Sequence, residues 1–411
     1  MKESPTEIIT MPNGIRLAYV RSNSAVGHIA FYFKGGSRSE PASSPGLAHF
    51  LEHCIFKGTQ KRKSLWILTR LDEVGGDLNA FTSKEEICVH ATFLNRYTKR
   101  AIELISDLLV NSTFPPQEID KEKDVVIDEI NSYKDSPLDR LMDEFDRLFF
   151  GSHPLGNPIL GTKKSVKSFK REDLLNFIKS NFTSDNLVVS YVGREPKQKL
   201  IDLLDSNLHG MPSHASSLNF IAPSVPKPFE IRKKESNFQS HAIFGAPAPS
   251  FNEEDRMAMN ILINYLGGPA MNARLNLIIR EKYGLAYHVE ANYAVLEDSG
   301  FWAILLSAEQ KNINKAIELA KQELARLVDR GMTPVQLKKS KYQFLSQLSM
   351  GWESNNARAM TNGKTLLVFN RIDSLEETFR KINGITLDEI NIAAKKYFAE
   401  HNHCLLVYDK K

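Results

Sequence analysis

Residues 45–55 read Pro-Gly-Leu-Ala-His-Phe-Leu-Glu-His-Cys-Ile, and the rest of the chain is organised around this stretch. With Ser44 as the N-cap and the following proline as the first helical residue, a helix is expected to begin there. At about 100° per residue, His49, Glu52 and His53 share one face of that helix. The apolar side chains occupy the opposite face. The stretch therefore predicts a helix with one buried apolar face and an opposite face that carries two imidazoles and a carboxylate.

The face with His49, Glu52 and His53 has the side chains of a zinc site. Neutral imidazoles one helical turn apart can bind one tetrahedral zinc ion. The glutamate between them can accept a proton from a water molecule that the ion activates. The spacing is the HxxEH pattern. The alternative is a surface helix that carries two histidines by accident. Cys54 turns toward the apolar side and is expected to be a core thiol rather than a ligand.

Length, charge and cysteine count limit the class of protein to which the chain can belong. A chain of 411 residues with 42% apolar residues can fill two domains, because single cores rarely exceed about 250–300 residues. A net charge of +4 gives no reason to expect a nucleic-acid or membrane partner. Three scattered cysteines suit a reducing compartment. No leader pattern and no long apolar run is present, so a cytoplasmic location is expected.

The order of expected elements repeats along the chain. Strands and helices alternate up to a Ser- and Pro-rich stretch, and the same order returns after it. The tetrapeptide Ala-Ile-Glu-Leu begins at Ala101 and again at Ala316, and other matching helix starts have nearly equal offsets. We therefore expect an α+β fold with two homologous domains from an internal duplication, each an antiparallel-rich sheet with helices packed on it. The expected bounds are 1–205 for the zinc-binding domain, 206–229 for the linker and 230–411 for the domain without the metal motif.

Two histidines leave a zinc ion short of a protein ligand. A helix that opens at Pro116 places Glu122 and Glu129 on its apolar face. A buried unpaired carboxylate costs several kcal/mol, so a cation or proton donors are expected opposite. Zinc and its histidines would meet that need. The alternative is a half-buried face on which both carboxylates reach water. The apolar residues expected on this face are Ile119, Val125, Val126, Ile130 and Tyr133.

His49-Phe-Leu-Glu-His53, with Glu129 lying 76 residues after His53, resembles the pitrilysin/insulinase family of zinc peptidases. These are the inverzincins of peptidase family M16, and the likeness is strongest to the short, two-domain branch that includes the mitochondrial processing peptidases. The resemblance implies that His49, His53 and Glu129 bind Zn²⁺, one ion per chain, and that Glu52 is the general base. It also implies that Glu122 orients a zinc-binding histidine.

A second part of the resemblance concerns substrate. Gly75–Ser83 is similar to the family's edge strand, which pairs with an extended peptide by β-augmentation. Asn79, Ala80 and Phe81 would then contact the substrate. Without the resemblance, this segment is a Gly-Gly turn that leads into a strand.

A third part lies in the second half of the chain. Arg280-Glu-Lys-Tyr-Gly-Leu-Ala-Tyr287 matches an arginine and a tyrosine of the family. The resemblance implies that Arg280 and Tyr287 contact the substrate backbone and the developing oxyanion near zinc. Without the resemblance, Arg280 would be read as an ordinary surface charge.

Together, these features predict a zinc metalloendopeptidase. It would hydrolyse small flexible peptides inside a chamber formed by dimerisation, because longer family members enclose substrate between two such halves. A homodimer is expected since this chain carries both the zinc motif and the arginine and tyrosine; a heterodimer with a related subunit is the alternative. Two other functions remain open: a processing peptidase that removes leader peptides, and a non-catalytic core or assembly subunit of the family.

Overall fold

A computed structural model describes residues 5–213, 218 and 220–411. The chain forms two compact units, and each combines segments that are distant in sequence. The first unit comprises Met1–Asn131, Asn157–Asn219 and Met350–Ser374. The second comprises Ser132–Gly156, Phe220–Ser349 and Leu375–Lys411.

The first unit is built on a six-stranded sheet with the order β1-β2-β6-β3-β5-β4. β2 and β6 run parallel, and the other neighbours run antiparallel. β4 is an edge strand that pairs on one side with β5, from Asp77 opposite Thr92 to Thr82 opposite Ile87. The strands are β1 (Glu7–Thr10), β2 (Arg16–Arg21), β3 (Val26–Lys34), β4 (Asp77–Thr82), β5 (Glu86–Leu94) and β6 (Leu187–Gly193).

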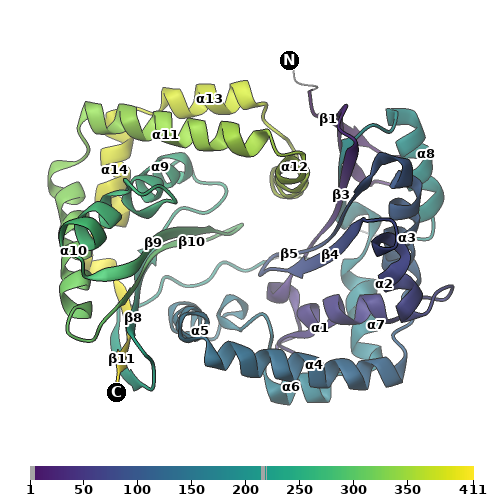
Figure 1. The fold of residues 1–411 in the computed structure, drawn as a ribbon, viewed down its shortest axis with the longest axis horizontal. Helices are drawn as coiled ribbons and strands as arrows, with labels where there is room; N and C mark the ends of the chain where they lie inside the picture. Colours follow the sequence, from purple (N-terminus) through teal and green to yellow (C-terminus); the bar gives the residue numbers. More distant parts are fainter. Residues whose placement is uncertain (1–4, 214–217, 219) are drawn as a thin grey trace. The chain divides into compact units, whose positions relative to one another are not determined.

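Helices cover one face of this sheet and form the larger core of the unit (Figure 1). Apolar side chains of β2, β3, β5 and β6 alternate toward these helices, as expected for a sheet with a buried face. Phe31 and Phe50 are fully buried in this core. The helices are α1 (Leu47–Cys54), α2 (Ser64–Asp72), α3 (Thr98–Asn111), α4 (Pro116–Asp135), α6 (Lys163–Ser168), α7 (Arg171–Asn181) and α8 (Lys197–Leu208).

The second unit has a five-stranded sheet with the order β7-β11-β8-β10-β9. β7 and β11 run parallel, and the other neighbours run antiparallel. The strands are β7 (Glu230–Glu235), β8 (Ser240–Pro247), β9 (Ala286–Val295), β10 (Gly300–Ala308) and β11 (Cys404–Lys410). The helices are α5 (Pro137–Phe150), α9 (Arg256–Gly267), the π-helix η6 (Asn276–Lys282), α10 (Ile313–Arg330), α11 (Pro334–Trp352), α13 (Leu375–Gly384) and α14 (Leu387–Tyr397).

The two sheets share one topology. In both, a parallel strand pair is followed by three antiparallel neighbours, and the last strand in the order is an edge. The helices that begin at Pro116 and Pro334 occupy corresponding places in the two series. The prediction of an α+β fold with two similar sheet-and-helix domains is confirmed.

The compact units differ from the expected contiguous halves because the halves exchange one helix each. α12 (Asn355–Phe369) belongs to the first unit, where it packs on the sheet face opposite α1. α5 comes from the first half of the chain but packs on the sheet of the second unit. Residues 214–217 and 219 of the expected linker lie outside the described residues.

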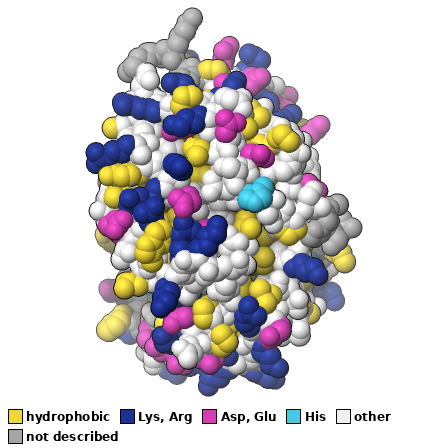
Figure 2. Space-filling model, turned by 90° about the vertical axis from the view of Figure 1, so that its right-hand side faces the viewer, with side chains coloured by type: hydrophobic (Ala, Val, Ile, Leu, Met, Phe, Trp, Pro, Cys, Tyr) yellow, Lys and Arg dark blue, Asp and Glu magenta, His cyan; other side chains and the backbone are white. Residues whose placement is uncertain are grey.

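Two further observations concern the helices and the surface of the described residues. Within the described part of the chain, no helix is both long enough and apolar enough to cross a membrane. On the face drawn in Figure 2, basic, acidic and hydrophobic side chains are intermixed. This mixture agrees with the small net charge of the chain.

Candidate metal centre

Helix α1 turns its apolar back into the core of the first unit. Leu47, Phe50 and Leu51 on this side are at most 2% exposed. Cys54 is also buried there as a free thiol, as predicted, and burial raises its pKa. The helix thereby presents its other face, with the two histidines and Glu52, away from the core.

The predicted start of this helix was wrong. Gly46 is the N-cap, with a φ of 93°, and it offers no side chain for capping. The left-handed conformation suits glycine, and a Cβ here would also lie 2.7 Å from the Cα of Gly161. Ser44 and Pro45 therefore precede the helix. The carboxylate of Glu40 replaces the missing cap and accepts the N–H groups of Gly46 and Ala48, both at 2.8 Å.

The two histidines meet a glutamate from α4. One ligand atom from each of His49, His53 and Glu129 can be chosen so that all three lie within 4.8 Å of one another. Nε2 of His49 is 3.7 Å and Nε2 of His53 is 3.4 Å from Oε2 of Glu129. This is the only group of three or more potential metal ligands in the described ranges.

The spacing and chemistry of this group fit zinc. A tetrahedral zinc ion with bonds of about 2.0–2.1 Å holds its ligand atoms about 3.4 Å apart, and it accepts nitrogen and carboxylate donors. Both imidazoles turn Nε2 toward Glu129. Three protein ligands would leave the fourth position of a catalytic zinc site for water or substrate.

Hydrogen bonds outside the group fix the orientation of His53. Its Nδ1 lies 3.3 Å from Oε2 of Glu122, whose Oε1 lies 2.7 Å from Nζ of Lys57. Bonding at Nδ1 leaves Nε2 of His53 as the atom available to a metal. Glu122, expected on sequence grounds to orient a histidine, therefore lies where such a residue is needed.

The two histidines have different proton affinities. Burial, with a smaller contribution from His53, lowers the pKa of His49 to about 4, so its ring is neutral at neutral pH. Burial also acts to lower the pKa of His53, but Glu122, Glu129 and Glu52 outweigh it and raise that pKa. The pKa of Glu122 is held below its usual range: burial acts to raise it, and hydrogen bonds from His53 and Lys57 prevail.

Glu52 lies beside the metal ligands. Its Oε2 accepts a hydrogen bond of 2.7 Å from Oγ1 of Thr82, the last residue of β4. Burial raises the pKa of Glu52, against the opposing effect of the Thr82 hydroxyl. A carboxylate with a raised pKa accepts and returns protons closer to neutral pH, as a general acid–base group must.

The predicted substrate strand is β4, and its place at the edge of the sheet leaves one side without a partner strand in the described residues. Asn79 is exposed, and its side chain donates to both carboxylate oxygens of Asp77 at 3.2 Å. Ala80 packs against the core on the α1 side. Phe81 lies on the opposite side, with its ring centroid 6.1 Å from that of Tyr32.

Arg280 and Tyr287 lie together in the second unit, at the end of η6 and the start of β9. The guanidinium carbon of Arg280 is 5.3 Å from the centroid of the Tyr287 ring. Tyr287 is 81% exposed, which is unusual for a large aromatic side chain. Their role at the metal centre remains a prediction from the resemblance.

Sequence reasoning missed two residues of the site. Lys57 continues the i, i+4 series from His49 and His53, so that spacing could have indicated it. Thr82 lies in the strand already singled out, but no local pattern identifies it as the partner of Glu52. On α4 the buried face is narrower than expected: Val125 and Tyr133, both placed on the apolar face, are 49% and 38% exposed.

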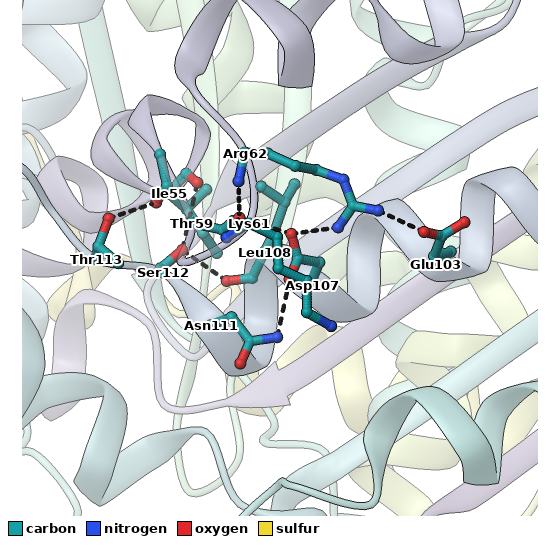
Figure 3. Close-up of polar contacts among 11 residues, drawn as sticks. Ile55, Thr59, Lys61, Arg62, Glu103, Asp107, Leu108, Asn111, Ser112 and Thr113 are labelled. Carbon is teal, nitrogen blue, oxygen red and sulfur yellow. Dashed lines mark hydrogen bonds and ion pairs between the residues drawn. The ribbon is translucent and has the colours of Figure 1, made fainter.

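A polar cluster anchors the segment after α1 onto α3 (Figure 3). Asp107 of α3 accepts hydrogen bonds from Thr59 at 2.7 Å and Asn111 at 2.8 Å, and it also pairs with Arg62. Arg62 reaches Glu103 as well. These contacts hold the chain that leaves the metal-site helix.

The fold and the metal-ligand group are those of a zinc-peptidase-like protein, and comparisons with known proteins agree. Residues 16–163 match the insulinase (peptidase family M16) model, and residues 168–344 match that of the peptidase M16 inactive domain. The chain is 32% identical over 393 residues to YmxG of Bacillus subtilis (strain 168), named an uncharacterized zinc protease, with 95% of each chain covered. The chain therefore belongs to peptidase family M16, the insulinase family.

Solved structures share this fold. A structure described as the peptidase M16 inactive domain from Pseudomonas fluorescens superposes with a TM-score of 0.92 and 17% identity, covering 99% of this chain and 98% of that one. A protease from Helicobacter pylori gives a TM-score of 0.91 with 20% identity, covering 99% and 100%.

Proposed function

We propose that this protein is a zinc-dependent endopeptidase that hydrolyses small, flexible peptides. The observation that carries the proposal is the approach of His49, His53 and Glu129 to one another with Glu52 beside them. Relatives named zinc proteases support it. We further propose one Zn²⁺ per chain, held by these three ligands, because the second unit has no comparable group among its described residues.

Zinc, when bound, would supply a Lewis acid that polarises the scissile carbonyl and makes water easier to deprotonate. Glu52 would take the proton from the attacking water as the new C–O bond forms. The same carboxyl would then give that proton to the amine as the C–N bond breaks. The hydroxyl of Thr82 holds the Glu52 carboxylate in position for both transfers.

The substrate would bind as an extra strand on β4. Edge strands have free N–H and C=O groups, which pair with an extended peptide regardless of its sequence. Such a peptide would run past Thr82, and therefore past Glu52. Folded proteins offer few extended segments, so flexible peptides are the favoured substrates.

The first test is Glu52→Gln, which keeps the shape of the side chain and removes the base. Peptide hydrolysis should fall by about 10²–10⁴-fold, while zinc binding should persist because Glu52 is not a ligand. Hydrolysis is read by mass spectrometry of a mixed peptide library. Glu118→Gln is the matched control, because this carboxylate is on α4 and pairs with exposed Lys121. The Glu118→Gln variant should have normal activity. Near-normal turnover by zinc-loaded Glu52→Gln protein would refute the assignment.

Two other functions would give different experimental results. A processing peptidase would cut one site in a larger precursor rather than many sites in free peptides. A non-catalytic subunit would not need zinc, and a protein that lacks stoichiometric zinc would favour that role. The approach of His49, His53 and Glu129, with Glu52 at hand, argues against a non-catalytic role.

A further inference from the structure

The helix that carries the metal ligands begins without a capping side chain of its own. α1 has eight residues, and Gly46 at its N-cap contributes only backbone. The first N–H groups of a helix have no partner within the helix and need one elsewhere. Glu40, six residues before Gly46, accepts two of them, one on each carboxylate oxygen. Glu40 is 8% exposed, so water cannot replace it easily.

These contacts lie next to the reacting groups. Ala48, whose N–H donates to Glu40, directly precedes His49, and its carbonyl faces the Thr82 hydroxyl at 3.5 Å. The same hydroxyl donates to Glu52. The first turn of α1 is therefore held on one side by Glu40 and approached on the other by β4.

The segment that contains Glu40 is also attached to the turn between β4 and β5. The N–H of Ser37 donates to the carbonyl of Ser83 at 2.9 Å, and the N–H of Arg38 donates to that of Lys84 at 2.7 Å. The buried guanidinium of Arg38 pairs with Glu85. Within four residues, this segment thus contacts the end of the edge strand and the start of the metal-site helix.

We propose that Glu40 is a positioning residue, which sets where His49 and Glu52 on α1 lie relative to Thr82 on β4. The inference rests on the proposed function for its catalytic consequence. Its structural part, that the Glu40 carboxylate orders the first turn of α1, stands independently. A glutamine here keeps the size of the side chain, but its NH₂ group would face a backbone N–H that needs an acceptor.

The experiment compares Glu40→Gln with Asp107→Asn. Asp107 is a matched control because it is also buried, at 4% exposed, and accepts several hydrogen bonds in the same unit (Figure 3), but its partners Thr59, Arg62 and Asn111 lie beyond α1 in the chain rather than on it. Both variants should unfold at a lower temperature. Only Glu40→Gln should show faster hydrogen exchange in residues 46–55, and only it should change the visible spectrum of the Co²⁺-loaded protein.

For peptide hydrolysis, Glu40→Gln should lower kcat by about 10–100-fold, as for other residues that orient a metal site. KM should change little, since β4 itself is intact. Burial raises the pKa of Glu40 to about 8, so its role depends on its two acceptor oxygens rather than on its charge. Glu40→Asp, which keeps both oxygens, should recover part of kcat and of the exchange protection. If wild-type protein cleaves no peptide, the proposed function fails, but hydrogen exchange still tests Glu40. Unchanged exchange in residues 46–55 of Glu40→Gln would overturn the inference.

Discussion

Two charged side chains, Lys57 and Glu122, fix the orientation of the His53 ring. Lys57 binds one oxygen of Glu122, and the other oxygen faces Nδ1 of His53. Glu122 is 5% exposed, so its charge would be costly without these partners. Lys57 thus fixes Glu122, and Glu122 fixes His53, which is a predicted zinc ligand.

Lys57→Met should weaken zinc binding although Lys57 is not a ligand. The methionine keeps most of the apolar stem, but Glu122 loses its 2.7 Å partner and its hold on His53. Loss of such an outer partner weakens metal affinity by about 10–100-fold. Chelator competition measures the change. Lys121→Met, which removes an exposed lysine from the same helix as Glu122, should bind zinc normally; equal affinity of the two variants would contradict the role of Lys57.

Zinc affinity should depend on pH through His53. A protonated imidazole cannot bind zinc, so affinity falls as the pH drops through the pKa of the ring. The pKa of His53 is raised by its carboxylate neighbours, so the fall should begin above about pH 6.5, the ordinary value for histidine. His49, with a pKa of about 4, should contribute only in stronger acid.

Glu122→Gln should shift the pH at which zinc is lost in the opposite direction, toward lower pH. Without the carboxylate that favours the imidazolium, the pKa of His53 should fall, and the acid loss of zinc should begin at lower pH. Affinity in mild alkali should drop as well, because the orienting hydrogen bond is weaker. Chelator competition between about pH 5 and 8 separates the two effects. An unchanged onset would show that Glu122 does not set the pKa of His53.

Helix α12 packs closely on the sheet of the first unit. Leu366 and Leu367 pack against Ala30 and Tyr32 of β3. At Gly363, a Cβ would lie 2.5 Å from Cδ2 and 2.6 Å from Cε2 of the Tyr32 ring. Glycine is thus required here by the close approach of helix and sheet, although it weakens the helix itself.

Gly363→Ala should therefore destabilise the protein. Alanine in a helix normally gains about 0.5–1 kcal/mol over glycine, but the clash with buried Tyr32 should reverse the sign, at a net cost of about 1–3 kcal/mol. Gly351→Ala is the control, because a Cβ there would meet nothing within 4 Å in α11. Thermal unfolding should show opposite shifts for the two variants. A stabilised Gly363→Ala protein would mean that α12 does not pack as described.

The elements differ in how far the sequence predicts them. The helical period predicted α4 and the buried apolar side of α1, because each follows from residues that are close together in the chain. The start of α1 could not be predicted locally, since its cap is Glu40 rather than Ser44. The hydrogen bond between Thr82 and Glu52 and the exchange of α5 and α12 likewise depend on packing between segments far apart in the chain. A pattern read over a short stretch of sequence cannot predict such packing.

At the scale of the molecule, the two units differ in the candidate functional residues that they carry. Only the first contains a metal-ligand group among its described residues. The second contains Tyr287, which is 81% exposed and whose ring centroid lies 5.3 Å from the guanidinium carbon of Arg280. An exposed pair of this kind suits contact with a substrate or another chain. We propose that the protein forms a homodimer, in which Arg280 and Tyr287 of one chain assist the metal site of its partner.

Mixing two inactive variants tests this arrangement. Glu52→Gln removes the base but keeps Tyr287, and Tyr287→Phe does the reverse. If sites form between chains, each mixed dimer has one intact site, and equal mixing should restore about a quarter of wild-type activity in a two-fold dimer. The double variant, mixed with either single variant, cannot form an intact site and should restore none. If native mass spectrometry detects mixed dimers without restored activity, the partner assignment of Tyr287 is wrong. The peptidase proposal would stand, because it rests on His49, His53, Glu129 and Glu52 of one unit.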